Sequence, residues 1–156
     1  MSWESKFISL CDHISSWSKD TSTKVGAVIT NRRNKILSIG YNGLPIGVND
    51  DPDIYPDRHQ RPEKYQWYSH AEENAIASAA EMGVSLKGAK IYCNYLPCCN
   101  CARMIIQSGI TEVVFQHADV NSAKNSESWQ KSKEVTIKMF NESKVIVRQY
   151  QQNSLI

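Results

Sequence analysis

Helical and strand-like segments alternate along the chain from His70 onward. The first helix of this series is rich in alanine and glutamate, which favour helices, and Pro97 stands where a proline suits the start of the second. In chain order we expect a helix over 70–82, a strand over 90–95, a helix over 98–108, a strand over 112–116, a helix over 126–140 and a strand over 144–149. This alternation predicts the α/β class, in which helices cover the faces of a central sheet.

The segment before His70 has a helix pattern, a hairpin pattern and a long loop. An amphipathic helix is expected over 2–17, because apolar residues recur there every three or four positions. Apolar runs at 25–29 and 36–39 flank a polar turn and predict a β-hairpin. Residues 40–68 contain all but one of the prolines and are expected to form an irregular loop, which in a small domain is usually functional or disordered. We see no repeat and no boundary, and expect a single domain over 1–156.

The charge balance and the cysteines limit the function classes. With 18 basic and 16 acidic residues the formal net charge is +2, which argues against a protein that holds nucleic acid through bulk charge. The chain has no run of the ~20 apolar residues that a membrane span requires, and its first residues do not resemble a signal peptide. We therefore expect a cytoplasmic protein with neither nucleic acid nor membrane as partner. Five cysteines, three of them within residues 98–101, do not resemble a secreted disulfide framework.

Two short segments contain the residues with the strongest chemical meaning. His70-Ala71-Glu72 has the form H-x-E, and Pro97 to Cys101 has the form P-C-x-x-C. A catalytic zinc ion takes three protein ligands and keeps one position for water, and His70, Cys98 and Cys101 would supply the three. The two cysteines share one face of the first helical turn, where the helix dipole favours their thiolates. One zinc ion per subunit is therefore expected, and it would lower the pKa of its water ligand toward neutrality.

Two other interpretations of the cysteines remain open at this point. A lone C-x-x-C also occurs in structural zinc sites and in dithiol redox motifs. A Cys₄ site would need two more thiolates, and the remaining Cys11, Cys93 and Cys99 include no second C-x-x-C. Glu72 favours a catalytic site, because a purely structural site has no use for an acid beside the metal.

At these residues the chain resembles the zinc-dependent cytidine and deoxycytidylate deaminase superfamily, for which H-x-E with P-C-x-x-C is a signature. It is most similar to the deoxycytidylate (dCMP) deaminases. Three further stretches are similar to that branch: residues 23–29, the loop G-Y-N-G-x-P at 40–45, and the segments 96–98 and 102–110. The resemblance implies a hydrolase with a three-layer αβα sandwich, in which a five-stranded mixed sheet is flanked by helices.

The same resemblance implies the reaction and the roles of several residues. The reaction is hydrolysis of dCMP to dUMP, which supplies thymidylate synthesis. Glu72 would be the catalytic acid–base residue, taking a proton from the attacking water and giving it to N3 of cytosine. Asn42 would contact the sugar, although Asn-Gly is also a common turn, and the Ala71 carbonyl would accept from the cytosine amino group.

Regulation and assembly are also implied by the resemblance. Many family members are hexamers that are activated by dCTP with Mg²⁺ and inhibited by dTTP, and Tyr41, Asn42 and Gly43 belong to the loop that takes part. We therefore expect a homo-oligomer with dCTP and dTTP as effectors. The chain departs from the better-known regulated enzymes in reading HAEENAI for HAELNAI, and it lacks the insertion that holds a second zinc in some relatives.

The phosphate of a nucleotide would need cationic or amide donors. Arg58, Arg61 and Lys64 precede His70 closely and are candidates, although a basic loop can equally be solvated. Aromatic residues beside them could pack on the base, close the pocket or belong to the core: Tyr65, Trp67 and Tyr68.

Two competing functions remain open from the sequence. Relatives act on free cytidine, guanine, tRNA adenosine or a riboflavin precursor, and the near-neutral charge weighs against the tRNA. The G-Y-N-G-x-P loop weighs against cytidine and guanine. A non-catalytic zinc module that binds a nucleotide or a partner is the second alternative, and turnover would distinguish it.

Overall fold

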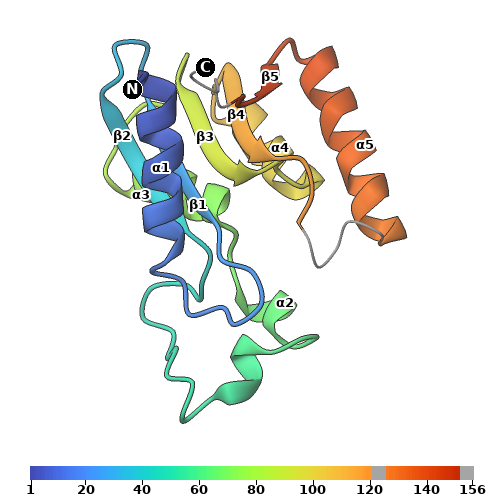
Figure 1. The fold of residues 1–156 in the computed structure, drawn as a ribbon. Helices are drawn as coiled ribbons and strands as arrows, with labels where there is room; N and C mark the ends of the chain where they lie inside the picture. The colour runs from blue at the N-terminus through green and yellow to red at the C-terminus, as the bar shows by residue number, and fades with distance from the viewer. Residues whose placement is uncertain (121–125, 152–156) are drawn as a thin grey trace.

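A five-stranded mixed sheet forms the centre of the computed structural model, which describes residues 1–120 and 126–151 (Figure 1). The strand order is β2-β1-β3-β4-β5. An antiparallel hairpin is formed by β1 (Gly26–Thr30) and β2 (Ile36–Tyr41), and β1 also pairs antiparallel with β3 (Lys90–Tyr95). β4 (Glu112–His117) and β5 (Ile146–Gln149) continue the sheet in parallel. The mixed five-stranded sheet expected from the resemblance is thus confirmed.

Helices cover both faces of this sheet. α1 (Trp3–Ser15) lies on one face and buries Phe7, Ile8, Cys11 and Ile14 against Val28, Tyr92 and Val114. The opposite face is covered by α3 (Ala71–Glu81), α4 (Cys99–Gln107) and α5 (Glu127–Glu142), whose apolar residues form the larger core. Figure 1 shows α1 on the near side of the sheet and α3 and α4 behind it. The αβα layering expected from the resemblance is confirmed.

The segment 40–68 is more ordered than the sequence indicates. It contains a 3₁₀ helix, η1 (Pro56–His59), and one turn of α-helix, α2 (Lys64–Trp67). Each follows a proline-containing stretch, and Pro56 itself occupies the first position of η1. Helices this short have no hydrophobic periodicity, which explains why the pattern of the sequence predicts only a loop. The termini of the longer elements differ from expectation by a few residues.

Gly40 determines how closely α3 approaches the sheet. A Cβ atom at this position would lie 2.3 Å from the carbonyl oxygen of Ala71 and 2.4 Å from the amide nitrogen of Ala75. Only glycine allows so close an approach, and the first turn of α3 therefore lies directly against β2. Asn74 strengthens this contact by donating from Nδ2 to the carbonyl oxygen of Tyr41 at 2.7 Å.

The topology brings several chain ends to one edge of the sheet. β2, β3 and β4 run toward this edge, and β1, which is antiparallel to β2 and β3, starts from it. The turns and helix starts that follow them therefore meet there, as is usual for ligand sites in open α/β sheets. Among the helices of the described residues, none has the length and apolar character needed to cross a membrane.

Candidate active site

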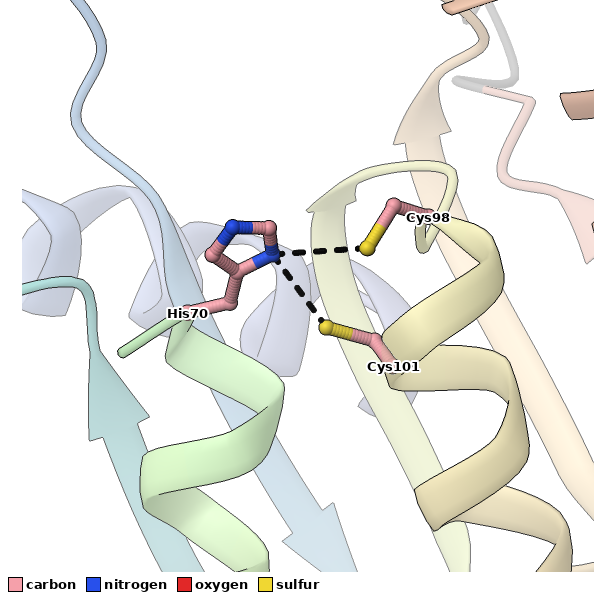
Figure 2. A group of neighbouring side chains, drawn as sticks. All are labelled: His70, Cys98 and Cys101. Carbon is pink, nitrogen blue, oxygen red and sulfur yellow. Dashed lines mark hydrogen bonds between the residues drawn. The ribbon is translucent and has the colours of Figure 1, made fainter. Parts of the chain in front are cut away.

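His70, Cys98 and Cys101 lie together at this edge of the sheet. Nδ1 of His70 is 3.4 Å from Sγ of Cys98 and 3.3 Å from Sγ of Cys101, and Figure 2 shows this nitrogen facing both sulfur atoms. The three ligand atoms lie within 4.8 Å of one another. Within residues 1–120 and 126–151 no second group of three such ligands occurs.

The spacing of these atoms fits a tetrahedral zinc ion. Zn–N and Zn–S bonds of about 2.0 and 2.3 Å at tetrahedral angles place nitrogen and sulfur about 3.5 Å apart. The two nitrogen–sulfur distances are within 0.2 Å of this separation. The donor set, one imidazole and two thiols, leaves a fourth position for water, as in catalytic rather than structural zinc sites.

Both halves of the zinc site are placed by helix N-termini. His70 is the N-cap of α3, and its backbone N–H donates to the Glu73 carboxylate at 2.8 Å. Cys98 is the N-cap of α4, so the helix begins one residue later than expected, with Cys101 in its first turn. Because helix N-termini carry partial positive charge, both helices favour thiolates at this point.

The electrostatics of the site distinguish the two cysteines. The hydrogen bond with Cys98 and burial raise the pKa of Cys101 above its ordinary value. A hydrogen bond from Cys101, together with the neighbouring His70, lowers the pKa of Cys98 to about 4, although burial opposes the shift. In turn the hydrogen bond with Cys98 is the main cause that raises the pKa of His70 to about 9. Cys98, which accepts these hydrogen bonds, is therefore the more acidic member of the pair.

Glu72 lies beside the ligands without being one. Its side chain is buried, and Oε2 is 3.6 Å from Sγ of Cys101. Burial raises the pKa of the Glu72 carboxyl above its ordinary value, although the charge of His70 opposes this. A raised pKa makes the carboxylate a stronger proton acceptor, as a general acid–base residue requires.

His70, Cys98 and Glu72 line a cavity of about 220 Å³. One wall comes from the segment before β1, the end of β2 and the region around α2, and it is polar. The other comes from the ends of β3 and β4 and the start of α5, and it is mainly apolar. The polar wall contains Asp20, Thr23, Asn42, Arg61 and Lys64, and the apolar wall contains Tyr95, Leu96, Val120 and Trp129.

A buried ion pair forms the centre of the polar wall. Nζ of Lys64 is 3.0 and 2.8 Å from the two carboxylate oxygens of Asp20 and 2.5 Å from Oγ of Ser22. Lys64 and Asp20 are only 4% and 3% exposed. An ammonium group has three N–H donors, and these three contacts use all of them. Lys64 thus joins α2 to the turn before β1, and its charge is neutralised by Asp20.

Asn42 and Ala71 also line the cavity. The Asn42 amide holds the turn before β1: Oδ1 accepts from the backbone N–H of Val25 at 2.8 Å, and Nδ2 donates to Asp20 and to the carbonyl oxygen of Thr23. A carbonyl oxygen has two lone pairs, so Oδ1 keeps the capacity for one more donor. Ala71, fully buried, is the first residue of α3 and adjoins His70 and Glu72.

The structure separates the two arginines of the loop. Arg61 lines the cavity, whereas Arg58 lies over the rings of Tyr55 and Trp67 and donates to the carbonyl oxygen of Asn49. Of the aromatic candidates, Tyr65 and Tyr68 line the cavity and Trp67 does not.

Tyr68 is held from behind by a buried histidine. Its hydroxyl is 2.7 Å from Nδ1 of His59. Burial raises the pKa of Tyr68 to about 12, so the hydroxyl stays protonated at neutral pH.

The loop at 40–45 borders a second hollow, outside the zinc cavity. A groove of about 600 Å³ lies between this loop and α3, and Tyr41 and Gly43 line it. Gly43 pairs with Ser69 through two backbone hydrogen bonds, of 3.1 and 2.8 Å. Asn42 therefore faces the zinc cavity, while its two neighbours face the groove.

Asp20 and Trp129 line the cavity, although no motif of the sequence points to either residue. Asp20 opens a polar turn, Asp20 to Thr23, whose composition is explained by turn formation alone. Trp129 lies in a helix in which an aromatic residue suggests only core packing. Neither residue has a sequence signal for the cavity, because each reaches it through tertiary contacts.

The comparisons with known proteins agree with this site. The profile of the family described as "Cytidine and deoxycytidylate deaminase zinc-binding region" matches residues 1–117. An "uncharacterized deaminase in luxG 3′ region" of Aliivibrio fischeri is 46% identical over 111 residues, 71% of this chain and 70% of that protein. The deoxycytidylate deaminase of Mus musculus is 40% identical over 119 residues, 74% of this chain and 65% of that enzyme. The matched segments thus span about two thirds of these relatives.

Solved structures share the fold. The dCMP deaminase of cyanophage S-TIM5, solved in complex with dCMP and dUMP, superposes with a TM-score of 0.71 over 94% of this chain and 96% of that one. Only 23% of the aligned residues are identical. The five-stranded sheet and its helices are therefore retained where the sequences have largely diverged.

Proposed function

The chain belongs to the cytidine and deoxycytidylate deaminase family, and from this premise we propose that it hydrolyses dCMP to dUMP and ammonia. One observation carries the proposal: the buried carboxyl group of Glu72 lies 3.6 Å from a zinc-ligand sulfur, at a cavity of the size of a small molecule. A non-catalytic zinc module would have no use for this arrangement.

The residues of the cavity divide the reaction between them. His70, Cys98 and Cys101 would hold a zinc ion, which when bound would supply the Lewis acidity that activates water as a nucleophile. Glu72 takes a proton from the water that attacks C4 and gives it to N3. Glu72 then moves the proton of the new C4 hydroxyl to the amino nitrogen, so that the C4–N bond breaks, ammonia leaves and the C4 carbonyl of uracil forms. The carbonyl oxygen of Ala71 orients the amino group by accepting its N–H.

The polar wall supports a deoxynucleotide as the substrate. Oδ1 of Asn42 accepts from a sugar hydroxyl with its second lone pair, while the bond from Val25 holds it in place. Lys64 has no donor left for a phosphate, so Arg61 is the cation of this wall that binds it. The deoxycytidylate deaminases among the relatives are named for the same substrate class.

Turnover of dCMP by the zinc-loaded protein tests this function, with Glu72→Gln as the comparison. The variant keeps the shape of the carboxyl group but cannot carry a proton. We expect dUMP from the wild type and a rate about 10²–10⁴-fold lower from the variant, with unchanged zinc content by atomic absorption. Deamination of deoxycytidine or adenosine instead of dCMP would refute dCMP as the substrate. If none of the three compounds is deaminated, the proposed deaminase activity is refuted.

We further propose that the loop at 40–45 regulates the enzyme. Tyr41 and Gly43 line a groove large enough for a nucleotide, and Asn42 connects their loop to the zinc cavity. Binding of dCTP with Mg²⁺ in the groove would tighten this connection, and dTTP would loosen it. Titration of both nucleotides into the assay tests the idea, and a rate that is unchanged at all substrate concentrations would contradict it.

Assembly into a homo-oligomer, a hexamer by analogy with the family, completes the proposal. Ile46 is 99% exposed beside the groove and Tyr41 is 40% exposed, as apolar contact residues of an interface would be in a single chain. Sedimentation equilibrium tests it. A single species at the 17.7 kDa of one chain would contradict assembly.

A further inference from the structure

The apolar wall of the cavity includes residues that follow the family-matched segment. The match ends at residue 117, whereas Val120 and Trp129 also line the cavity. These two residues do not belong to the zinc motif or to the polar wall. The part of the substrate that lies against Val120 and Trp129 is therefore contacted by residues outside the matched zinc-binding region.

The indole ring of Trp129 is held in a defined orientation. Its Nε1–H donates to Oδ1 of Asp119 at 3.2 Å, and Nζ of Lys133 binds the same oxygen at 2.8 Å. Lys133 lies one turn further along α5, so Asp119 holds the first turns of that helix to the segment that follows β4. Because the only polar atom of the indole is already bonded, the ring offers the cavity an apolar surface.

Contacts of α5 place Trp129 on the α4 side of the zinc site. Trp129, Ser132 and Thr136 are spaced three and four residues apart and share one helix face. Oγ of Ser132 accepts from the backbone N–H of Cys99 at 2.9 Å, and Thr136 donates to the carbonyl oxygen of Pro97 at 3.1 Å. This face of α5 thus lies against the start of α4, and Glu72, on α3, approaches the ligands from another helix.

The chemistry of the ring then indicates which atom of the base faces Trp129. C4 must face the nucleophile, and N3 must face Glu72 to receive its proton. C5 is the other neighbour of C4 in the ring, on the side opposite N3. If N3 points toward α3, C5 points away from it, toward α4 and the apolar wall that includes Trp129.

We propose that Trp129, oriented by Asp119, is a specificity-determining residue that sets the room for a substituent at C5 of the pyrimidine. The proposal rests on the deaminase function proposed above, and it names the part of the substrate that this wall selects. A hydrogen at C5 fits against the indole ring, whereas a methyl group or a halogen at C5 would clash with the ring.

The test compares kcat/KM for dCMP, 5-methyl-dCMP and 5-iodo-dCMP in the wild type, Trp129→Leu and Trp129→Ala. A single methyl-sized group in a fitted apolar pocket changes kcat/KM by roughly 10–200-fold. We expect the preference for the substituted substrates over dCMP to rise at least about tenfold in Trp129→Ala, and less in Trp129→Leu. Trp3→Leu is the matched control, because Trp3 is 53% exposed and lies on α1, and its preference should equal that of the wild type.

The orienting role of Asp119 is tested separately. Asp119→Asn keeps an acceptor for the indole N–H and should retain the wild-type preference among the three substrates. Asp119→Leu removes the acceptor and should shift the preference in the same direction as Trp129→Ala. A purely structural role of Asp119 would lower the melting temperature in Asp119→Leu and leave the preference unchanged, which would contradict the positioning role.

A fluorescence measurement keeps the proposal testable if Trp129→Ala does not fold. Binding of the product dUMP should quench tryptophan emission in the wild type and in Trp3→Phe, but not in Trp129→Phe, which retains a ring. Quenching that persists in Trp129→Phe, or an unchanged preference in a folded Trp129→Ala, would overturn the role of Trp129. Failure of the wild type to deaminate dCMP would instead overturn the proposed function, so the two failures are distinguishable.

Discussion

The two zinc-binding motifs and the polar wall border the same cavity but are built in different ways. Two short motifs at the starts of α3 and α4 supply the ligands, and each motif is placed by the backbone of its own helix. The centre of the polar wall joins Asp20, Asn42 and Lys64, which come from three segments far apart in the chain. The difference teaches that local capping orients each zinc-binding motif and the sheet topology brings the two motifs together, whereas the polar wall depends on individual long-range side-chain contacts.

The two regions also differ in how charge is neutralised. At the zinc site the two cysteines lie at the positive end of the α4 dipole, and a bound zinc ion would neutralise their thiolates. In the polar wall a buried lysine faces a buried carboxylate, and each would be costly without the other. Loss of one residue should therefore stop chemistry in the first region and weaken folding in the second.

Removal of one zinc ligand should have the largest effect on activity, and it should disrupt the zinc site without disrupting the polar wall. Cys101→Ser replaces a thiolate ligand by a poor one, so we expect loss of zinc and of detectable deamination, with a retained circular dichroism spectrum. Cys99→Ser is the matched control, since Cys99 lies in the same turn but is outside the ligand group. Equal zinc content and equal activity in the two variants would contradict the assignment of ligands.

Removal of the buried ammonium group of Lys64 should destabilise the polar wall and leave zinc binding unchanged. Lys64→Met leaves Asp20 buried without its partner, and breaking a buried pair costs about 3–5 kcal/mol. We expect this decrease in the free energy of unfolding by urea denaturation, with unchanged zinc content. The control is Lys19→Met, which breaks the exposed pair with Asp50 and should cost about 1 kcal/mol or less. Equal losses in both variants would show that burial does not distinguish the pairs.

Removal of Arg61 should sharpen the comparison within the polar wall. A hydrogen bond to a charged group contributes about 1.5–3 kcal/mol, so Arg61→Ala should raise the KM for dCMP roughly 10–100-fold. The KM for deoxycytidine, which has no phosphate, should change little. Arg58→Ala is the control, because Arg58 does not line the cavity. Equal effects of Arg61→Ala on both substrates would refute a phosphate contact.

The smallest expected effect is that of acid, which should reduce the stability that the Asp20 carboxylate contributes to the polar wall. Burial raises the pKa of Asp20, but the bonds from Lys64, Ser22 and Thr23 together outweigh it and hold this pKa below its ordinary value. A depressed carboxyl pKa contributes stability above the unfolded-state pKa of about 3.9 and loses it as the pH falls through the folded-state value.

The measurement compares the wild type with Asp20→Asn. The difference in unfolding free energy between them should be constant above about pH 5 and shrink below about pH 4. Because both proteins contain the same zinc ligands, acid effects on the metal site cancel in this difference. A difference that grows as the pH falls would have the wrong sign for a stabilising Asp20 carboxylate.

Local sequence patterns were sufficient to predict most of the secondary structure. The order of the longer helices and strands was predictable, because apolar periodicity, Pro97 and the polar turn between β1 and β2 act over a few residues. The layering and the count of five strands came from the resemblance and are confirmed. The short helices η1 and α2 were missed, since one turn of helix contains too few residues for a period.

The sequence by itself determined the reactive centre. Two motifs, each placed at the start of a helix by backbone capping, contain all three zinc ligands and Glu72, and their residue types allow little other chemistry. Tertiary structure decided the pairing of Lys64 with Asp20, the facing of Asn42 and Tyr41 into different hollows, and the position of Trp129. The physical reason is that a helix start orients its own side chains, whereas a buried charge or an aromatic wall acquires its role only from the partner that packing places beside it.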